Sequence, residues 1–297
     1  MEFIKYTKIY FLISLIVLVP GLISLIFIGL RPSIDFTGGS LIEIQTRQPV
    51  SETQIRQSVA DADLDLSSLV RSTDNSYLLR LKPIDQSQHD SLLVALNTSY
   101  EGVFSQRFET IGPTVGAELT KRAVMAVSLA SLAIIAYIAW SFRSVPKPYS
   151  SWKFGITAII ALGHDLLVVL GLFSIFGHFF AVEVDALFVT ALLTVIGFSV
   201  HDTIVVFDRI RENLGKQPHL TFSQVADFSL TETLGRSLNT SATVILTLTS
   251  LLLFGGSAIR WFVIALLIGI VSGTYSSIFN ATPLLVLWTS RSKPVQK

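Results

Sequence analysis

The chain has 297 residues, of which 51% are hydrophobic and only 14% charged, and its formal net charge is +1. Soluble domains carry about 25% charged residues, so the composition favours a membrane protein, and the small net charge argues against a nucleic-acid partner. The sequence contains no cysteine, which excludes disulfides, thiolate catalysis and cysteine-ligated zinc.

Six long apolar runs predict six membrane-spanning helices. They lie at residues 9–30, 123–142, 156–177, 186–207, 239–256 and 261–288. The first run is longer than the apolar core of a typical signal peptide, and Arg31-Pro32-Ser33 follows it where a small-residue cleavage site would stand. We therefore expect it to remain as an anchor.

Basic residues in the short loops predict the orientation, because cytoplasmic loops carry an excess of lysine and arginine. They gather on one side of the predicted membrane: Lys5, Lys8, Arg143, Lys147, Lys153, Arg209, Arg211, Lys216, Arg236, Arg291, Lys293 and Lys297. The short loops on the other side carry only Arg260. Both termini are therefore predicted to be cytoplasmic and the long loop, residues 31–122, extracytoplasmic.

The long loop is predicted to fold as strand, helix, strand, strand, helix, strand, the order of a small ferredoxin-like α+β domain. Ser51 and Gln54 resemble a capping box at the start of its first helix. The predicted organisation is thus residues 1–30 for the N-terminus and first span, 31–122 for the extracytoplasmic domain, 123–290 for a five-span bundle and 291–297 for a cytoplasmic tail.

An acidic residue and an arginine stand where lipid does not tolerate them. Asp202 lies near the cytoplasmic end of the fourth span, and Arg236 precedes the fifth, where it heads a stripe of hydroxyls at helical spacing that includes Thr240, Thr243 and Thr247. Such a stripe is expected to face protein or water. A titrating acid beside a guanidinium indicates a proton route, whereas an ion pair that only locks two helices together fits the spacing equally well.

Other polar residues in the spans are candidates for either a relay or a structural role: His164, Asp165, His201 and Asn280. For His164 and Asp165 we favour helix–helix hydrogen bonding, because the third span offers them no basic partner. The sequence has no HExxH motif and no Walker-type loop. We therefore predict no metal, no cofactor and no hydrolase or ATPase activity.

Several motifs resemble those of the SecF family of membrane proteins. Ile34 to Ser40 reads IDFTGGS after the first span, and Ile111 to Gly116 reads IGPTVG before the second. His164-Asp165 matches in the third span, and Gly197 to Asn213, reading GFSVHDTIVVFDRIREN, leaves the fourth. His201 departs from the pattern, in which asparagine is common, and this weakens a proton-shuttle role for His201.

The resemblance implies an accessory subunit of the Sec preprotein translocase in the bacterial inner membrane, related to the proton-driven RND transporters. With SecD it would use the proton-motive force to promote protein export, and 31–122 would lie in the periplasm. The implied partners are SecD, the SecYEG channel with SecA, and the translocating preproteins. A wider group of partners would include YidC and YajC. The implied proton-relay residues are Asp202 and Arg236.

The motif after the first span, with Asp35, Gly38 and Gly39, has a physical interpretation of its own. Two consecutive glycines allow a sharp turn where the helix passes into the first strand, and a hinge is the less favoured alternative.

Two other functions remain open at this level. A small-molecule exporter of the RND type shares the proton chemistry, but such chains usually have twelve spans and two large outer loops. An intramembrane aspartyl protease would use Asp165 and Asp202, which fall in adjacent antiparallel spans, but its usual Tyr-Asp and Gly-x-Gly-Asp contexts are absent.

Overall fold

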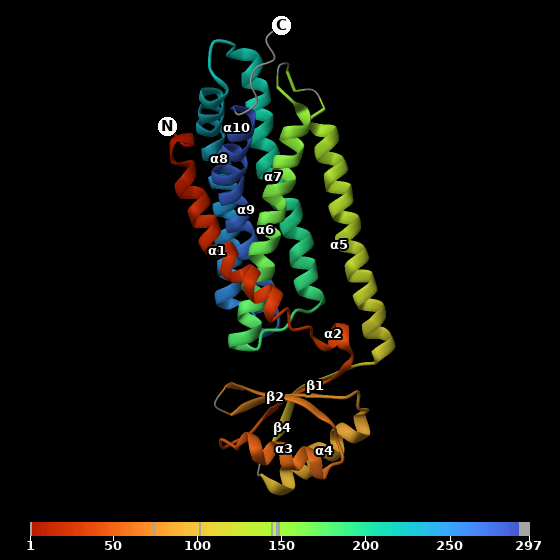
Figure 1. The fold of residues 1–297 in the computed structure, drawn as a ribbon. Coiled ribbons are helices and arrows are strands. Elements are labelled where there is room, and N and C mark those ends of the chain that lie inside the picture. Colours follow the sequence, from red (N-terminus) through yellow and green to blue (C-terminus); the bar gives the residue numbers. More distant parts are fainter. Residues whose placement is uncertain (1, 74, 101, 144, 147–148, 291–297) are drawn as a thin grey trace. The chain divides into compact units, whose positions relative to one another are not determined.

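The computed structural model describes residues 2–73, 75–100, 102–143, 145–146 and 149–290 (Figure 1). The predicted tail, 291–297, lies outside them. Within the described residues, six helices are long and apolar enough to cross a membrane, as predicted: Ile4–Phe27, Pro113–Ser141, Ser151–Phe180, Ala186–Lys216, Phe222–Phe254 and Arg260–Ser290. The shortest has 24 residues and is about 36 Å long, enough for a hydrocarbon core of about 30 Å.

The first and last of these helices are composite. A short 3₁₀ turn, η1 (Ile4–Tyr6), leads into α1 (Thr7–Phe27). The last comprises α9 (Arg260–Ser276), a π-helical segment η3 (Ser277–Ala281) and α10 (Thr282–Ser290), and the 3₁₀ turn η2 (Ser257–Ile259) precedes it. Pro283 follows the π segment. Because proline has no N–H to donate to the preceding turn, the hydrogen-bond ladder is interrupted at this point.

The four remaining long helices are unbroken: α5 (Pro113–Ser141), α6 (Ser151–Phe180), α7 (Ala186–Lys216) and α8 (Phe222–Phe254). The helix α8 begins well before the predicted span at residue 239. Thr221 and Gln224 form a capping box there, which satisfies free N–H groups at the start of a polar first half. Hydropathy detects only the apolar half of such a helix.

The chain divides into two compact units. A helical unit comprises Met1–Arg31, Met125–Val182 and Leu187–Lys297, and an α+β unit comprises Pro32–Val124 with Glu183–Ala186. The second unit therefore includes a short segment from the loop between the third and fourth spans, which the sequence did not assign to it. Within the helical unit, α1 begins and α10 ends at the same end (Figure 1).

The α+β unit is an antiparallel sheet covered on one face by two helices (Figure 1). Its strands are β1 (Gly39–Gln45), β2 (Leu66–Thr73), β3 (Ser76–Leu81) and β4 (Phe104–Ile111), in the order β2-β3-β1-β4. Helices α3 (Glu52–Asp61) and α4 (Gln86–Ser99) cover the sheet, and the one-turn helix α2 (Ile34–Thr37) precedes β1. The predicted ferredoxin-like order of elements is confirmed.

Alternation along the strands builds the core of this unit, because every second side chain faces the helices. Ile42 and Ile44 of β1, and Tyr77 and Leu79 of β3, are fully buried. The predicted capping box of Ser51 and Gln54 starts α3.

The helical unit is held at its centre by close approaches of small residues. A Cβ atom added to Gly21 of α1 would lie 3.0 Å from the Cα of Gly171 of α6. One added to Gly273 of α9 would lie 3.1 Å from the Cα of Ser199 of α7. Small residues let helix backbones approach in membrane proteins, where the hydrophobic effect does not drive helices together.

The Tyr77 hydroxyl offers a test of the α+β core. It donates to the Val50 carbonyl at 2.5 Å and accepts from the Val50 N–H at 3.0 Å, tying the loop before α3 to β3. We expect Tyr77→Phe to destabilise this unit by about 1–3 kcal/mol, because both backbone groups lose their partner. Hydrogen exchange at the amides of β1 and β3 should be faster in the variant. The exposed Tyr137 of α5 provides the control: Tyr137→Phe should leave exchange unchanged, and equal exchange in both variants would contradict the assignment.

Candidate functional site

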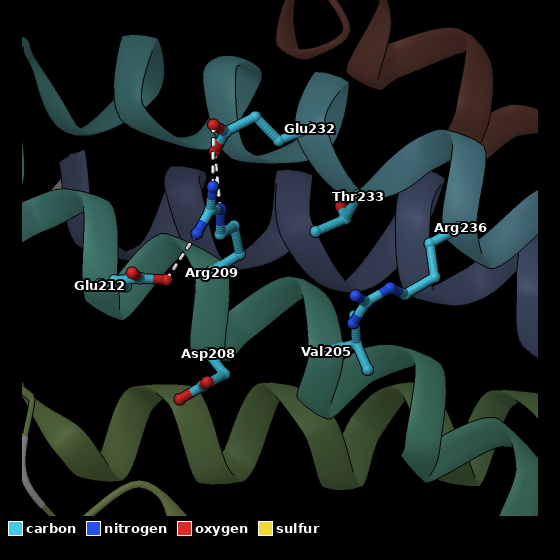
Figure 2. A pocket seen from close by; sticks show the side chains of 7 residues that line it. All are labelled: Val205, Asp208, Arg209, Glu212, Glu232, Thr233 and Arg236. Atoms are coloured by element: carbon cyan, nitrogen blue, oxygen red, sulfur yellow. Dashed lines mark hydrogen bonds and ion pairs between the residues drawn. The ribbon is translucent and has the colours of Figure 1, made fainter.

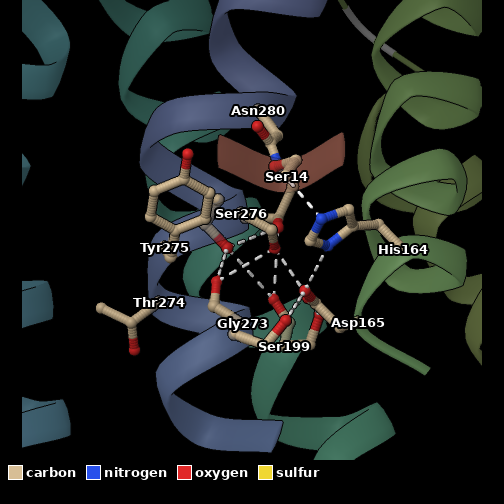
Figure 3. Close-up of polar contacts among 12 residues, drawn as sticks. Ser14, His164, Asp165, Ser199, Gly273, Thr274, Tyr275, Ser276 and Asn280 are labelled. Carbon is tan, nitrogen blue, oxygen red and sulfur yellow. Dashed lines mark hydrogen bonds and ion pairs between the residues drawn. The ribbon is translucent and has the colours of Figure 1, made fainter. Parts of the chain in front are cut away.

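Asp165, midway along α6, is fully buried in a cluster of hydroxyl groups (Figure 3). Its Oδ2 accepts from Ser199 at 2.6 Å and from Ser276 at 2.7 Å, and its Oδ1 accepts from Ser272 at 2.7 Å. The Nδ1 of His164 lies 3.0 Å from Oδ1. These four contacts match the roughly four acceptor positions of an ionised carboxylate. We call these five residues the Asp165 cluster.

Three helices contribute to the Asp165 cluster. Ser199 comes from α7, while Ser272 and Ser276 stand one turn apart on the same face of α9. The contact of Gly273 with Ser199 brings α9 close enough to α7 for these short side chains to reach one carboxyl. The sequence analysis missed Ser199 and Ser272, although the i, i+4 spacing of Ser272 and Ser276 was a usable signal.

A second line of polar contacts leads from the Asp165 cluster to α1. The Nε2 of His164 lies 3.3 Å from the Nδ2 of Asn280, which donates to the Oγ of Ser14 at 2.6 Å (Figure 3). Asn280 belongs to the π-helical segment, which turns its side chain toward α6 and α1. The favoured helix–helix role of His164 and Asp165 agrees with this geometry, because their contacts join four helical segments.

Asp202 of α7 is also buried, yet its surroundings differ from those of Asp165. The Nδ1 of the preceding residue, His201, lies 3.4 Å from Oδ1, longer than a usual hydrogen bond. The Ser241 and Thr274 hydroxyls lie next to the carboxyl, but they bond to each other at 2.6 Å, and Thr274 donates to the Ile270 carbonyl. Asp202 is therefore less tightly held by hydrogen-bond donors than Asp165.

His201 connects Asp202 to the surface of the chain. Its side chain is 62% exposed, whereas that of Asp202 is 4% exposed. The residue in contact with the buried carboxyl is thus itself exposed.

Arg236 does not pair with Asp202 in this chain. It lines a charged pocket of about 320 Å³ together with Val205, Asp208, Arg209, Glu212, Glu232 and Thr233. Figure 2 shows Arg209 bound to Glu232 and Glu212, while no bond joins Arg236 to the other residues drawn. The sequence left open whether the guanidinium contacts Asp202, and no such contact is formed within the part of the chain that the structure describes.

The rotation of α8 explains this difference. Ser237, Ser241 and Leu248 face the interior, whereas the stripe of Arg236, Thr243 and Thr247 is exposed, and Thr240 is half-buried. Adjacent residues of a helix point about 100° apart, so the buried seam and the predicted stripe are neighbouring rows. Thr243 and Thr247 donate to carbonyls of their own helix at 2.8 and 2.9 Å, so their hydroxyls are satisfied without a partner helix.

The end of the fourth-span motif holds α7 against α8. Arg209 binds Glu232 through two nitrogens, at 2.7 and 2.9 Å, and Asn213 donates to Glu232 at 2.8 Å and to Ser229 at 2.9 Å. A bidentate guanidinium–carboxylate pair is geometrically specific. The motif thus combines a buried acid with a helix clamp, and sequence reasoning assigned the clamp no role.

The geometry does not fit an intramembrane aspartyl protease. Such a site needs two carboxyls close enough to share one proton, about 3 Å apart. Asp165 and Asp202 have separate partners, and no hydrogen bond joins them among the described residues. Within those residues there is also no cluster of three or more histidine, aspartate or glutamate side chains that could hold a metal ion.

Comparison with known proteins gives a consistent result. Residues 93–291 match the C-terminal signature of the SecD/SecF protein export membrane proteins, and residues 23–50 match the SecD/SecF GG motif. The chain is 46% identical to the protein translocase subunit SecF of Thermobaculum terrenum, over 98% of this chain and 94% of the relative. The SecF of Anaerolinea thermophila is 44% identical over 95% of this chain and 92% of the relative.

The chain belongs to the SecD/SecF family of protein translocase subunits. Its resemblance to SecF, predicted from the motifs, is confirmed. The crystal structure of SecDF from Thermus thermophilus, a translocon-associated membrane protein, matches with a TM-score of 0.83 and 31% identity, over 98% of this chain and 39% of SecDF. The chain is thus a multi-pass membrane protein of a transport family. Its predicted architecture of six spans and an α+β unit matches the corresponding part of SecDF.

The two acids should respond differently to mutation. Asp165→Ala removes four hydrogen bonds among three helices, and at about 0.6 kcal/mol each in a membrane this destabilises the fold by roughly 2 kcal/mol. We expect a lower unfolding midpoint when the purified chain is titrated from mild detergent into dodecyl sulfate. Asp208→Ala, which removes a half-exposed acid from α7, is the matched control and should change the midpoint little. Equal midpoints for the two variants would show that the Asp165 cluster does not stabilise the bundle.

Proposed function

We propose that this chain is the SecF half of a SecD–SecF assembly that uses the proton-motive force to promote protein export across the bacterial inner membrane. The family supports a role in the protein translocase and an association with SecD. The single observation that carries the proton-driven mechanism is the contrast between the two buried acids: Asp165 accepts from three serines, whereas Asp202 has a long contact to an exposed histidine and lies beside two hydroxyls that bond to each other.

In this mechanism Asp202 takes up and releases the proton. A buried carboxyl with few donors is stabilised by protonation, and it loses that proton when a cation or water reaches it. Each proton that enters down a potential of 100 mV releases about 2.3 kcal/mol. Several such steps provide enough free energy for a shift between two arrangements of the protein.

The partner is proposed to cover the face of α8 that carries Arg236. In the most apolar stretch of α5 and α8, only 6% and 17% of the residues are buried inside the protein, whereas the corresponding shares are 44% and 50% for α6 and α7. Arg236 has no bond to the other described residues of its pocket, and an unpaired guanidinium next to a row of threonines is costly to leave in lipid. An acidic group on SecD is therefore the expected partner. The proton path would then run between the two subunits, with Asp202 and Arg236 on this side of it.

Several further features belong to the same proposal. The excess of basic residues in the short loops supports a topology with both termini in the cytoplasm and residues 31–122 in the periplasm. The assembly would act on preproteins that emerge from the SecYEG channel, which works with SecA. YidC and YajC are further proposed partners. The chain would contribute no ATPase or hydrolase chemistry of its own.

The direct test is Asp202→Asn in cells that depend on this chain for efficient export. We expect the stimulation of export by the proton-motive force to be lost, because the amide cannot carry a proton, while the chain still assembles with SecD. Precursor processing in pulse-labelled cells measures export, and co-purification in mild detergent measures assembly.

Asp65→Asn is the control for this test, since it removes an exposed acid of the α+β unit, away from the pocket of Arg236, and should leave export unchanged. Normal export by Asp202→Asn, with assembly intact, would reduce Asp202 to a packing residue and remove the basis of the proposal.

A further inference from the structure

The motif that follows the first span takes no part in the proton chemistry proposed above, although it lies in a defined structure. Residues Ile34–Thr37 form the helical turn α2, and the Ser33 hydroxyl accepts from the Asp35 N–H at 3.2 Å to cap it. Gly38 then adopts a φ of +70°, a conformation that glycine takes without strain. The chain thereby turns from α2 into β1.

Asp35 contacts the first residue of α7. Its Oδ2 accepts from the N–H of Ala186 at 2.9 Å. The first N–H groups of a helix have no partner within the helix, and the helix dipole makes that end positive, so a carboxylate is favourable there. Asp35 therefore acts as a cap supplied from a segment about 150 residues away in the sequence.

Backbone contacts between the segment that precedes Asp35 and the loop that precedes α7 support this cap. The Ser33 N–H donates to the Val184 carbonyl at 2.9 Å, and Pro32 pairs with Val184 in a parallel bridge. The chain around Asp35 and the chain entering α7 thus run side by side, which holds the carboxylate in place against Ala186.

Arg80 of β3 holds both segments at once. Its Nη1 donates to the Pro32 carbonyl at 3.0 Å, and its guanidinium contacts the carboxylate of Glu183. The two side chains are only 14% and 17% exposed, so the pair is shielded from solvent. Removing one partner of a shielded ion pair leaves an uncompensated charge, so loss of either side chain is expected to be destabilising.

The same turn packs against the start of α5. A Cβ atom on Gly116 would lie 2.8 Å from the Gly38 nitrogen, and the Thr120 hydroxyl contacts the Phe36 carbonyl at 3.3 Å. All these residues belong to the α+β unit. We call Pro32–Gly38, Arg80 and Glu183–Ala186 the α7 junction.

We propose that Asp35 is a positioning residue that, through the α7 junction, couples the α+β unit to the helix that carries Asp202. The inference rests on the proposed function, because it assigns the step that joins proton exchange to movement of the α+β unit. The helix α7 is unbroken from Ala186 to Asp202, a distance of about 24 Å at 1.5 Å per residue. A displacement of one end along the helix axis is therefore transmitted to the other.

The connectivity explains why α7 needs a non-covalent junction. The first and second spans are joined to the sheet by the chain itself, through Pro32 and through β4, which passes into α5. The segment that enters α7 reaches this unit through non-covalent contacts, which among the described residues include those of Ser33, Asp35 and Arg80 with Glu183–Ala186. Loss of the cap lowers the ratio of docked to undocked junction by about 5–30-fold, the equivalent of 1–2 kcal/mol.

The test uses the full chain, co-reconstituted with its SecD partner and the translocation channel in sealed vesicles, with two readouts. One is proton uptake driven by a pH gradient, and the other is preprotein transport driven by the same gradient. We expect Asp35→Ala to lose most gradient-driven transport, by about 5–30-fold, while proton uptake persists. Asp35→Asn should retain transport, because an asparagine oxygen accepts from a helix N–H as well as a carboxylate does.

Lys82→Ala is the matched control, since it removes an exposed ion pair between Lys82 and Asp65 in the same unit and should change neither readout. Asp202→Asn, by contrast, should lose both proton uptake and transport. These variants separate the two proposals. If the proposed function is wrong, transport by the unmodified chain does not depend on the gradient. If only the junction proposal is wrong, transport by the unmodified chain depends on the gradient and Asp35→Ala transports normally.

A reversible lock tests the junction even if Asp35→Ala accumulates poorly. The chain has no cysteine, so Pro32→Cys with Val184→Cys introduces a single bridgeable pair at the parallel bridge. We expect oxidation to leave transport unchanged and to restore it in Asp35→Ala. Inhibition by the oxidised lock in the otherwise unmodified chain, full transport by Asp35→Ala, or equal loss in Asp35→Ala and Asp35→Asn would each overturn the proposal.

Discussion

The carboxyl of Asp165 stands at the point where three helices meet, and the arrangement of the helical unit depends on keeping it hydrogen-bonded. A charge or an unsatisfied polar group inside a membrane protein costs several kcal/mol. Three serines from two other helices supply the donors, and they can do so only because Gly273 lets α9 approach the backbone of α7. The positions of α6, α7 and α9 are thereby fixed together.

This fixed centre gives Asp202 its chemical character. Asp202 and Ser199 lie on the same helix, less than one turn apart, so the Asp165 cluster also sets the depth and rotation of the second acid. One acid is held by four partners, and the other has a long contact to His201 at the surface. We interpret this as a division of roles, in which Asp165 maintains the helix packing and Asp202 exchanges the proton.

The features that follow from local periodicity could be predicted from the sequence. Apolar runs of span length, the alternation of Leu41 to Gln45 and the capping box at Ser51 each depend on residues near one another in the chain. The family motifs also marked the correct helices. The start of α8 was missed, because its first half is polar and is stabilised by a cap at Thr221 and the clamp of Glu232 to Arg209.

The arrangement around the site could not be predicted in the same way, because it depends on the rotation of helices and on contacts between distant segments. Arg236 and Ser237 are neighbours, yet one is exposed and the other is buried, and the hydroxyl pattern alone did not decide which row faces the interior. The serines around Asp165 come from positions 199, 272 and 276. The contact between Asp35 and Ala186 joins two loops that carry no periodic signal.

Infrared difference spectroscopy of the assembled SecD–SecF complex, recorded across a change of pH, tests most directly whether the two acids have different roles. A carboxyl that gains a proton shows a C=O stretching band that an ionised carboxylate does not have. Our account predicts a band that disappears in Asp202→Asn and persists in Asp165→Asn. A band that persists in Asp202→Asn and disappears in Asp165→Asn would show that the buried cluster, and not Asp202, exchanges the proton.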